Sequence, residues 1–119
     1  MANELTLGCT MRFVKGNVDV PKNPPLIQRN IAGTDYTMKT QLIGTTREAL
    51  VIGEIGTAYY LWIRNHDTTN YVEIFPDATN PALVKLLAGD VALFPLATST
   101  PNAQANTAAV EVDYFMVEL

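Results

Sequence analysis

The sequence predicts an all-β protein, a two-sheet antiparallel β-sandwich of jelly-roll type with about nine short strands and no long helix. Three observations predict it. Apolar and polar residues alternate with a period of two along most of the chain. Turn residues separate these stretches at the spacing of about 8 to 12 residues that is typical of sandwiches. The pattern also lacks a convincing amphipathic helix, and an up-and-down barrel is the second choice.

Composition is that of one globular domain spanning residues 1–119, because 48% of the chain is hydrophobic and 17% is charged. The formal net charge of -4 argues against a nucleic-acid binder. Residues 1–60 carry a net +1 and residues 61–119 a net -5, an asymmetry that could orient a partner. With no membrane-length apolar run and no charged signal-peptide start, we expect a protein made and kept in a cytoplasm.

The N-terminal part begins with a strongly alternating stretch, residues 5–13, which predicts a strand with one buried face. The only cysteine, Cys9, lies on that apolar face and is expected to act as a small buried hydrophobe. Gly16 and its neighbour Asn17 predict a bulge or tight turn before a second extended piece. The Pro-rich residues 21–25 are expected to end the sheet. We therefore expect residues 1–25 to form an extended segment that contacts a neighbour.

The middle of the chain predicts strands at residues 26–31, 36–43 and 49–52. In the second of these, Tyr36, Met38, Thr40 and Leu42 share one face. Residues 58–75 then read as a β-hairpin at the centre of a sheet, turning through the polar run 65–69. Its first arm sends Tyr59, Leu61 and Ile63 to one face and Tyr60, Trp62 and Arg64 to the other.

The C-terminal part predicts a loop at 76–81 and a second hairpin, in which residues 83–87 pair with residues 91–96 around Gly89. Residues 97–107 are small and polar, and we expect them to form a loop that is free to contact a neighbour. The last strand places one set of apolar residues on a single side: Val110, Val112, Tyr114 and Met116.

Side chains that could carry chemistry are few. A cupin metal site needs several His, and the chain has only His66, which is expected to be a solvated turn residue. Asp67 opens a run that lacks the acids of a calcium loop and predicts an Asx-type turn. Glu73 could pair with Glu111 or Asp113 as glycosidase carboxylates, although nothing in the pattern places them in a cleft. We expect no enzyme, and no catalytic, cofactor-binding or metal-binding residues.

Aromatic residues concentrate around residues 58–75, where Tyr60, Trp62 and Tyr71 could form an exposed platform for sugar. Core packing explains them more simply. One face of this stretch would then meet the opposite sheet, and the other would be covered by a neighbouring subunit.

Five segments, in order, carry a resemblance to known proteins. They are Phe-Val-Lys-Gly-Asn-Val-Asp-Val at 13–20, Ile-Gly-Thr-Thr-Arg-Glu-Ala-Leu at 43–50, Arg-Asn-His-Asp-Thr-Thr-Asn-Tyr-Val-Glu-Ile at 64–74, Lys-Leu-Leu-Ala-Gly-Asp-Val-Ala-Leu-Phe at 85–94 and Ala-Asn-Thr-Ala-Ala-Val-Glu-Val-Asp-Tyr at 105–114. Together they resemble small β-sandwich structural proteins of tailed bacteriophages, of the capsid decoration or cement type. The Pro-rich 21–25 connector departs from that pattern.

The resemblance implies a virion protein without catalysis, a homotrimer on the capsid surface that binds the major capsid protein lattice. It implies no cofactor, no nucleic-acid partner and no membrane. We expect the contacts to involve residues 1–20 and the loops at 76–81 and 97–107. A carbohydrate-binding or tail-associated adhesion module that uses the aromatic hairpin is the alternative.

Overall fold

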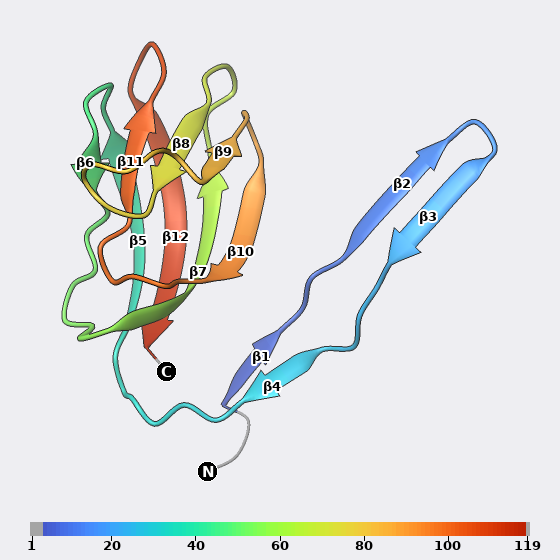
Figure 1. Ribbon diagram of the computed structural model, residues 1–119, viewed down its shortest axis with the longest axis horizontal. Coiled ribbons are helices and arrows are strands. Elements are labelled where there is room, and N and C mark those ends of the chain that lie inside the picture. The colour runs from blue at the N-terminus through green and yellow to red at the C-terminus, as the bar shows by residue number, and fades with distance from the viewer. Residues whose placement is uncertain (1–3, 119) are drawn as a thin grey trace. The chain divides into compact units, whose positions relative to one another are not determined.

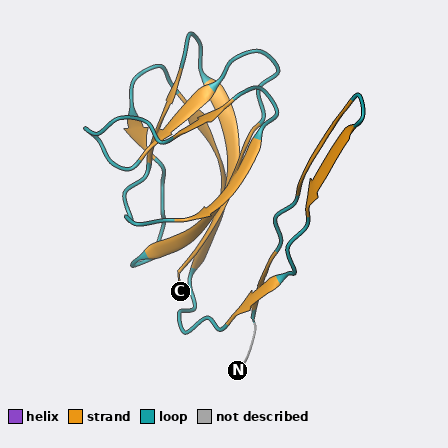
Figure 2. Cartoon of the chain, turned by 45° about the vertical axis from the view of Figure 1, so that its right-hand side comes forward, coloured by secondary structure: helices purple, strands orange, loops and turns teal. Residues whose placement is uncertain are grey.

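A computed structural model describes residues 4–118. The chain divides between Ala32 and Gly33 into two compact units. We call residues 4–32 the arm and residues 33–118 the sandwich. Both consist of antiparallel strands, and no helix occurs in residues 4–118 (Figure 2). The all-β prediction is therefore confirmed.

The sandwich has two four-stranded sheets, which are drawn with their labels in Figure 1. The first sheet has the order β10-β7-β12-β5, and the second has the order β6-β11-β8-β9. The strands of the first sheet are β5 (Tyr36–Ile43), β7 (Ala58–Asn65), β10 (Val91–Pro95) and β12 (Val110–Glu118). Those of the second sheet are β6 (Glu48–Ala49), β8 (Val72–Phe75), β9 (Val84–Leu86) and β11 (Asn102–Ala105).

The core lies between these sheets and follows the alternation of the sequence. All four apolar residues expected on one side of the last strand are fully buried. Leu61 and Ile63 on β7 are buried as predicted. The second sheet contributes residues with smaller side chains, which include Val72, Ile74, Ala103 and Ala105. The two-sheet sandwich is thus confirmed, whereas the jelly-roll type stays a prediction.

Strand pairing corrects the two predicted hairpins. β7 pairs with β10 and β12, while β8 pairs with β9 and β11, so residues 58–75 connect two sheets instead of forming one hairpin. β9 and β10 are likewise in different sheets. Both predictions were wrong because two strands joined by a short polar loop can pair, or can pack face to face. Local sequence does not distinguish these arrangements.

Asn65 is the residue that joins the two loops where the chain crosses between sheets. Its side chain is fully buried, and its amide nitrogen donates to the carbonyls of Asn70 (2.9 Å) and Leu86 (3.1 Å). Its Oδ1 accepts from the backbone N–H of Asp67 at 2.8 Å. Because every one of these bonds is made inside the protein, one buried amide connects the loop after β7 to the loop after β9.

Residues 97–107 were predicted to be a loop, and this is wrong for their second half. β11 lies inside the second sheet between β6 and β8, with Ala103 and Ala105 buried. Small side chains suit this position, since the facing sheet supplies large ones such as Tyr114 and Met116. The sequence reasoning treated small residues as unable to pack, when they pack against large partners.

The arm is two successive two-stranded ribbons. β1 (Leu5–Leu7) pairs with β4 (Ile27–Arg29), and β2 (Met11–Lys15) pairs with β3 (Val18–Lys22). Gly16, with φ of 58°, and Asn17 connect β2 to β3, which confirms the predicted tight turn. The total of 12 strands exceeds the expected number of about nine, since residues 5–13 divide into two strands and β11 is added. Of the strand predicted at 49–52, only Ala49 lies in a strand, β6 (Glu48–Ala49).

Two expectations for the arm were wrong, and a third was correct only in part. Its strands are exposed, with Met11 74% and Phe13 51% accessible, although alternation predicted one buried face. Cys9 is exposed and lies outside the strands. The Pro-rich residues 21–25 do end the ribbon, since β3 stops at Lys22, but Pro21 is still part of β3, opposite Arg12, where a ribbon edge tolerates the missing N–H. Alternation of apolar and polar residues predicts an amphipathic ribbon. Burial of its apolar side requires a second layer, which residues 4–32 do not form.

Candidate interaction surfaces

The acidic residues considered as a catalytic pair lie apart. Glu73 is flanked on β8 by the buried Val72 and Ile74, so it faces outward from the second sheet. Glu111 and Asp113 alternate with buried residues on β12 and face outward from the first sheet. The core lies between these two surfaces, and the three carboxylates do not converge.

His66 meets one carboxylate, with its Nε2 3.5 Å from Oδ2 of Asp113 and its side chain 41% exposed. Within residues 4–118, no group of three or more His, Cys, Asp or Glu is placed to hold a metal ion. Asp67 forms the predicted Asx-type turn, since its Oδ2 accepts from the backbone N–H groups of Thr69 and Asn70. These bonds favour the ionised carboxylate and lower the pKa of Asp67.

The aromatic residues considered as a sugar platform do not share one surface. Tyr60 is 8% exposed and Trp62 half-buried, both on the outward side of β7. Tyr71 precedes β8, and its ring is covered by the ammonium of Lys85 on β9, 4.1 Å from the ring centroid. Trp62 and Tyr71 therefore belong to different sheets.

The side of the first sheet that faces away from the core exposes several large apolar residues. We call this side the outer face. The register of the four strands aligns Leu93, Trp62, Phe115 and Met38 in one row. The next row is Pro95, Tyr60, Val117 and Tyr36. The rings of Tyr36 and Phe115 meet edge to face at 5.9 Å. Five large residues of this face are exposed: Tyr36 64%, Met38 70%, Leu42 64%, Val91 55% and Phe115 37%.

Strand β5 carries the clearest signal of an external partner, because its apolar side faces out and its polar side faces in. Tyr36, Met38 and Leu42 point outward, whereas Thr37 and Gln41 lie on the side of Ile43, which is fully buried. Lys39, on the same side, is exposed, whereas Thr37 has a partner: its Oγ1 donates to the Ile52 carbonyl at 2.6 Å. Sequence reasoning grouped these residues on the correct faces without telling which face was exposed.

The inward polar groups of β5 hold the segment that follows β6. Gln41 Nε2 donates to Glu48 and to the Ala49 carbonyl, each at 3.1 Å. The hydroxyl of Tyr114 lies 2.7 Å from the Val51 carbonyl, to which it donates, and 3.0 Å from Gln41 Oε1. Burial of this phenol disfavours its ionised form and raises the pKa of Tyr114 to about 12.

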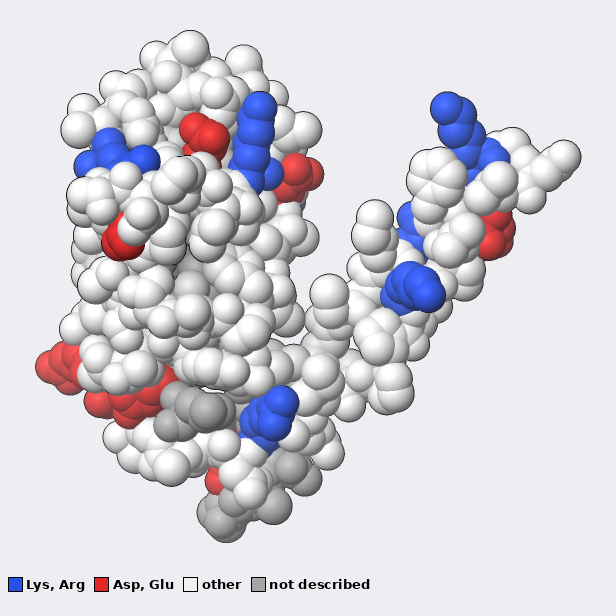
Figure 3. Space-filling model, in the orientation of Figure 1, with Lys and Arg blue, Asp and Glu red and all other residues white. Residues whose placement is uncertain are grey.

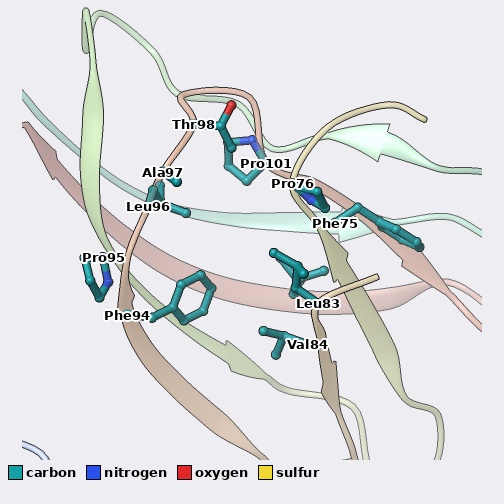
Figure 4. A pocket seen from close by; sticks show the side chains of 11 residues that line it. Phe75, Pro76, Leu83, Val84, Phe94, Pro95, Leu96, Ala97, Thr98 and Pro101 are labelled. Carbon is teal, nitrogen blue, oxygen red and sulfur yellow. The ribbon is translucent and has the colours of Figure 1, made fainter. Parts of the chain in front are cut away.

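A small apolar pocket lies where β8 and β9 of the second sheet approach β10 of the first (Figure 4). Its volume is about 150 Å³, close to that of cavities that hold one aromatic ring. Phe94 points toward Leu83 and Val84 across the opening (Figure 4). Apart from Thr98, the lining is apolar: Ile74, Phe75, Pro76, Leu83, Val84, Phe94, Pro95, Leu96, Ala97 and Pro101.

The loop at 76–81 borders this pocket and is held in one conformation. Asp77 Oδ1 accepts from the backbone N–H groups of Thr79 (2.9 Å) and Asn80 (2.8 Å), which lowers the pKa of Asp77 to about 2. The guanidinium of Arg47 stacks over the Phe75 ring at 3.6 Å and donates to the Asn80 carbonyl at 2.9 Å. Sequence analysis missed Arg47, for which the turn composition at 44–47 carried no signal.

Charge differs between the two units. Residues 1–32 contain four Lys and Arg against two Asp and Glu, a net +2, and residues 33–119 contain four against ten, a net -6. Figure 3 shows Lys and Arg along the arm, and extensive uncharged surface on the side of the sandwich in view. Opposite net charges on two units of one chain favour contact between copies.

Comparison with known proteins adds no identification, because the chain matches no protein-family model, no curated protein and no solved structure. No helix in residues 4–118 is long and apolar enough to cross a membrane. The class that the fold defines is an antiparallel β-sandwich with a β-ribbon arm.

Proposed function

We propose that the protein is a structural virion protein of a tailed phage that decorates the capsid as a homotrimer and stabilises it by binding the major capsid protein lattice. One observation carries the proposal: the outer face of the first sheet exposes the apolar side of β5 together with Phe115 and Val91. An exposed apolar patch of this kind marks an interaction surface. The similarity of segments 13–20 through 105–114 to phage decoration proteins adds to it.

The loop at 76–81 and the pocket beside it are the proposed contact with the lattice. Arg47 and the Asp77 turn hold this loop in place before any partner arrives, so little ordering entropy opposes binding. The pocket accepts one apolar or aromatic side chain from the capsid protein. The other predicted contact loop, at 97–107, contributes only residues outside β11, because Ala103 and Ala105 are buried.

Stabilisation follows from mass action. A protein that binds only the assembled lattice lowers the free energy of that lattice relative to free subunits. In a trimer, three small contacts act together, because the first contact brings the others to a high effective concentration. A pocket of this size is sufficient under those conditions, although a single copy would bind weakly.

Sedimentation with expanded capsids tests the proposal. We expect the purified full chain to have the mass of a trimer and to sediment with capsids of its phage. Leu83→Glu, which places a carboxylate at the pocket, should raise the dissociation constant for capsids at least about tenfold, equivalent to about 1.4 kcal/mol. Leu87→Glu is the matched control, because Leu87 is 55% exposed and does not line the pocket. A monomer that does not bind capsids would contradict the proposal.

A carbohydrate-binding or adhesion module is the second candidate, and the half-buried Trp62 beside Leu93 and Phe115 is the observation that favours it. Aromatic faces of this kind stack on sugar rings. Glycan-array binding that Trp62→Ala abolishes, in a variant with unchanged unfolding temperature, would favour this candidate over capsid binding.

A further inference from the structure

We propose that the β2-β3 ribbon of one copy packs its apolar side on the outer face of the first sheet of a second copy. This inference rests on the proposed self-association and names its two surfaces. The ribbon comprises Met11–Lys15 and Val18–Lys22. The ribbon can occupy the outer face without any capsid, so this contact can be tested separately from lattice binding.

The ribbon is amphipathic. Directly paired residues point to the same side, so Phe13 and Val20 share a side with Met11 and Val18. These residues are 51%, 47%, 74% and 48% exposed. The opposite side carries Arg12 and Asp19, which form an ion pair at 2.7 Å, together with Val14 and Pro21. The side with Phe13 is therefore the more apolar of the two and is suited to an apolar surface.

A ribbon of two strands does not bury this side by itself. An isolated two-stranded hairpin is marginally stable in water, and stability requires a third strand or a packing surface. Neither β2 nor β3 pairs with any other strand among residues 4–118. Each large apolar side chain that moves from water to a contact adds stability, so a covering surface orders the ribbon.

The outer face offers a surface of matching character. Its two apolar rows, which contain Trp62 and Phe115 at the centre, span all four strands of the first sheet. Beyond these rows the same side carries Asp113 and Glu111 on β12, with Arg64 of β7 directly opposite Asp113. The surface is therefore apolar over its middle and carries charges of both signs toward one end.

The charges of the two units favour a second copy of this chain as the partner of the outer face. Lys15 and Lys22 flank the apolar side of the ribbon, because Lys15 pairs with Val18 and Lys22 with Met11. Two cations beside an apolar stripe suit an apolar face on a unit of net negative charge. The net +2 of residues 1–32 and the net -6 of residues 33–119 act in the same direction over longer distances. A second copy of this chain supplies both properties.

Paired variants of the full chain test the contact by mass in solution. Phe13→Glu lies on the apolar side of the ribbon and Val14→Glu on the other side, at similar exposures of 51% and 60%. We expect Phe13→Glu to raise the dissociation constant of self-association at least about tenfold. Val14→Glu should leave it within about twofold. Equal effects of the two variants, or a wild-type chain that remains monomeric, would overturn the inference.

Crosslinking locates the receiving surface, because Cys9 is the only cysteine and is exposed on the arm. Wild-type chain is mixed with a Cys9→Ser, Met38→Cys variant and treated with a short bis-maleimide. The control partner is Cys9→Ser, Leu83→Cys, since Met38 is 70% and Leu83 74% exposed. We expect dimers that contain one chain of each kind with Met38→Cys and few with Leu83→Cys.

Equal yields from the two partners, or more product with Leu83→Cys, would overturn the inference. A single chain that carries both Cys9 and Met38→Cys provides a further check. If crosslinking of that chain at low concentration gives only an internally linked monomer, the arm occupies its own outer face and the exchange between copies is wrong. If the chain does not bind capsids but still crosslinks through Met38→Cys, the proposed function is wrong and the contact between copies is still supported.

Discussion

The arm and the sandwich have the same secondary structure and differ in what covers it. In the sandwich, the two sheets bury one side of β7 and of β12, and 15 apolar residues form one core cluster. In the arm, ribbons with equally strong alternation leave Phe13, Val14 and Val20 about half exposed or more. The difference teaches that a period of two encodes an amphipathic strand, and that a second layer decides whether its apolar side is a core or an interface.

The strongest test of this difference is a matched pair of truncations. Leu61→Ala in the core should lower the free energy of unfolding by about 3 to 4 kcal/mol, because Leu61 is fully buried and leaves a cavity. Phe13→Ala should change it by less than about 0.5 kcal/mol at concentrations where the chain is monomeric. Denaturant unfolding followed by Trp62 fluorescence measures both. Equal losses of unfolding free energy in the two variants would contradict the exposure of Phe13.

Asn65→Ala should have the next largest effect, a loss of roughly 3 kcal/mol, because it leaves the Asn70 and Leu86 carbonyls and the Asp67 N–H without their partner. Chemical unfolding provides the measurement. Thr68→Ala, an exposed change in the same loop, is the control and should be neutral within about 0.5 kcal/mol. A neutral Asn65→Ala would show that the two crossing loops do not depend on this amide.

Tyr114→Phe should cost about 1 kcal/mol at neutral pH, since the Val51 carbonyl loses its hydroxyl donor. The pH dependence is more diagnostic. In the unfolded chain the phenol ionises near 10, whereas the folded protein holds its pKa at about 12. Stability should therefore be intact below pH 10 and decline as pH rises from 10 through about 12. Thermal unfolding across this range should show the decline in wild type and a weaker one in the variant.

Asp77→Asn should have the smallest effect, because its carboxylate is fully exposed to solvent. The turn bonds lower the pKa of Asp77 from 3.8 to about 2, so they stabilise the fold above pH 3.8. That contribution is lost as pH falls through about 2. The difference in unfolding free energy between wild type and variant should therefore be constant above pH 3.8 and shrink as pH falls from 3.8 to about 2, and a difference that does not change across this window would contradict the assignment.

Sequence reasoning was most accurate for strands with one covered side. The residues that share the buried side of β12 were grouped correctly, as were Leu61 and Ile63 on β7, because apolar residues two apart in a strand face the same way. The strand over 83–87 was also correct, as β9 occupies Val84–Leu86. Reasoning failed at β11, where alanines fill a space set by Tyr114 and Met116 on the opposite sheet.

The candidate surfaces were only partly visible in the sequence. The alternation of β5 grouped Tyr36, Met38 and Leu42 on one side, and an uncovered aromatic face was expected near Trp62. That the apolar side of β5 points outward depends on Gln41 and Thr37, which hold residues 49–52 on the inside. Such contacts join segments that the strand pattern treats as independent.

By itself, the sequence determined the all-β class, the positions of most strands and which residues share a side, since side-chain alternation is a local property of extended backbone. Only the tertiary structure decided which strands pair, how Asn65 joins two crossing loops, and which apolar sides meet each other. The physical reason is that pairing and layering depend on contacts between residues far apart in the chain, and a period of two is the same whether its apolar side faces a core or a partner.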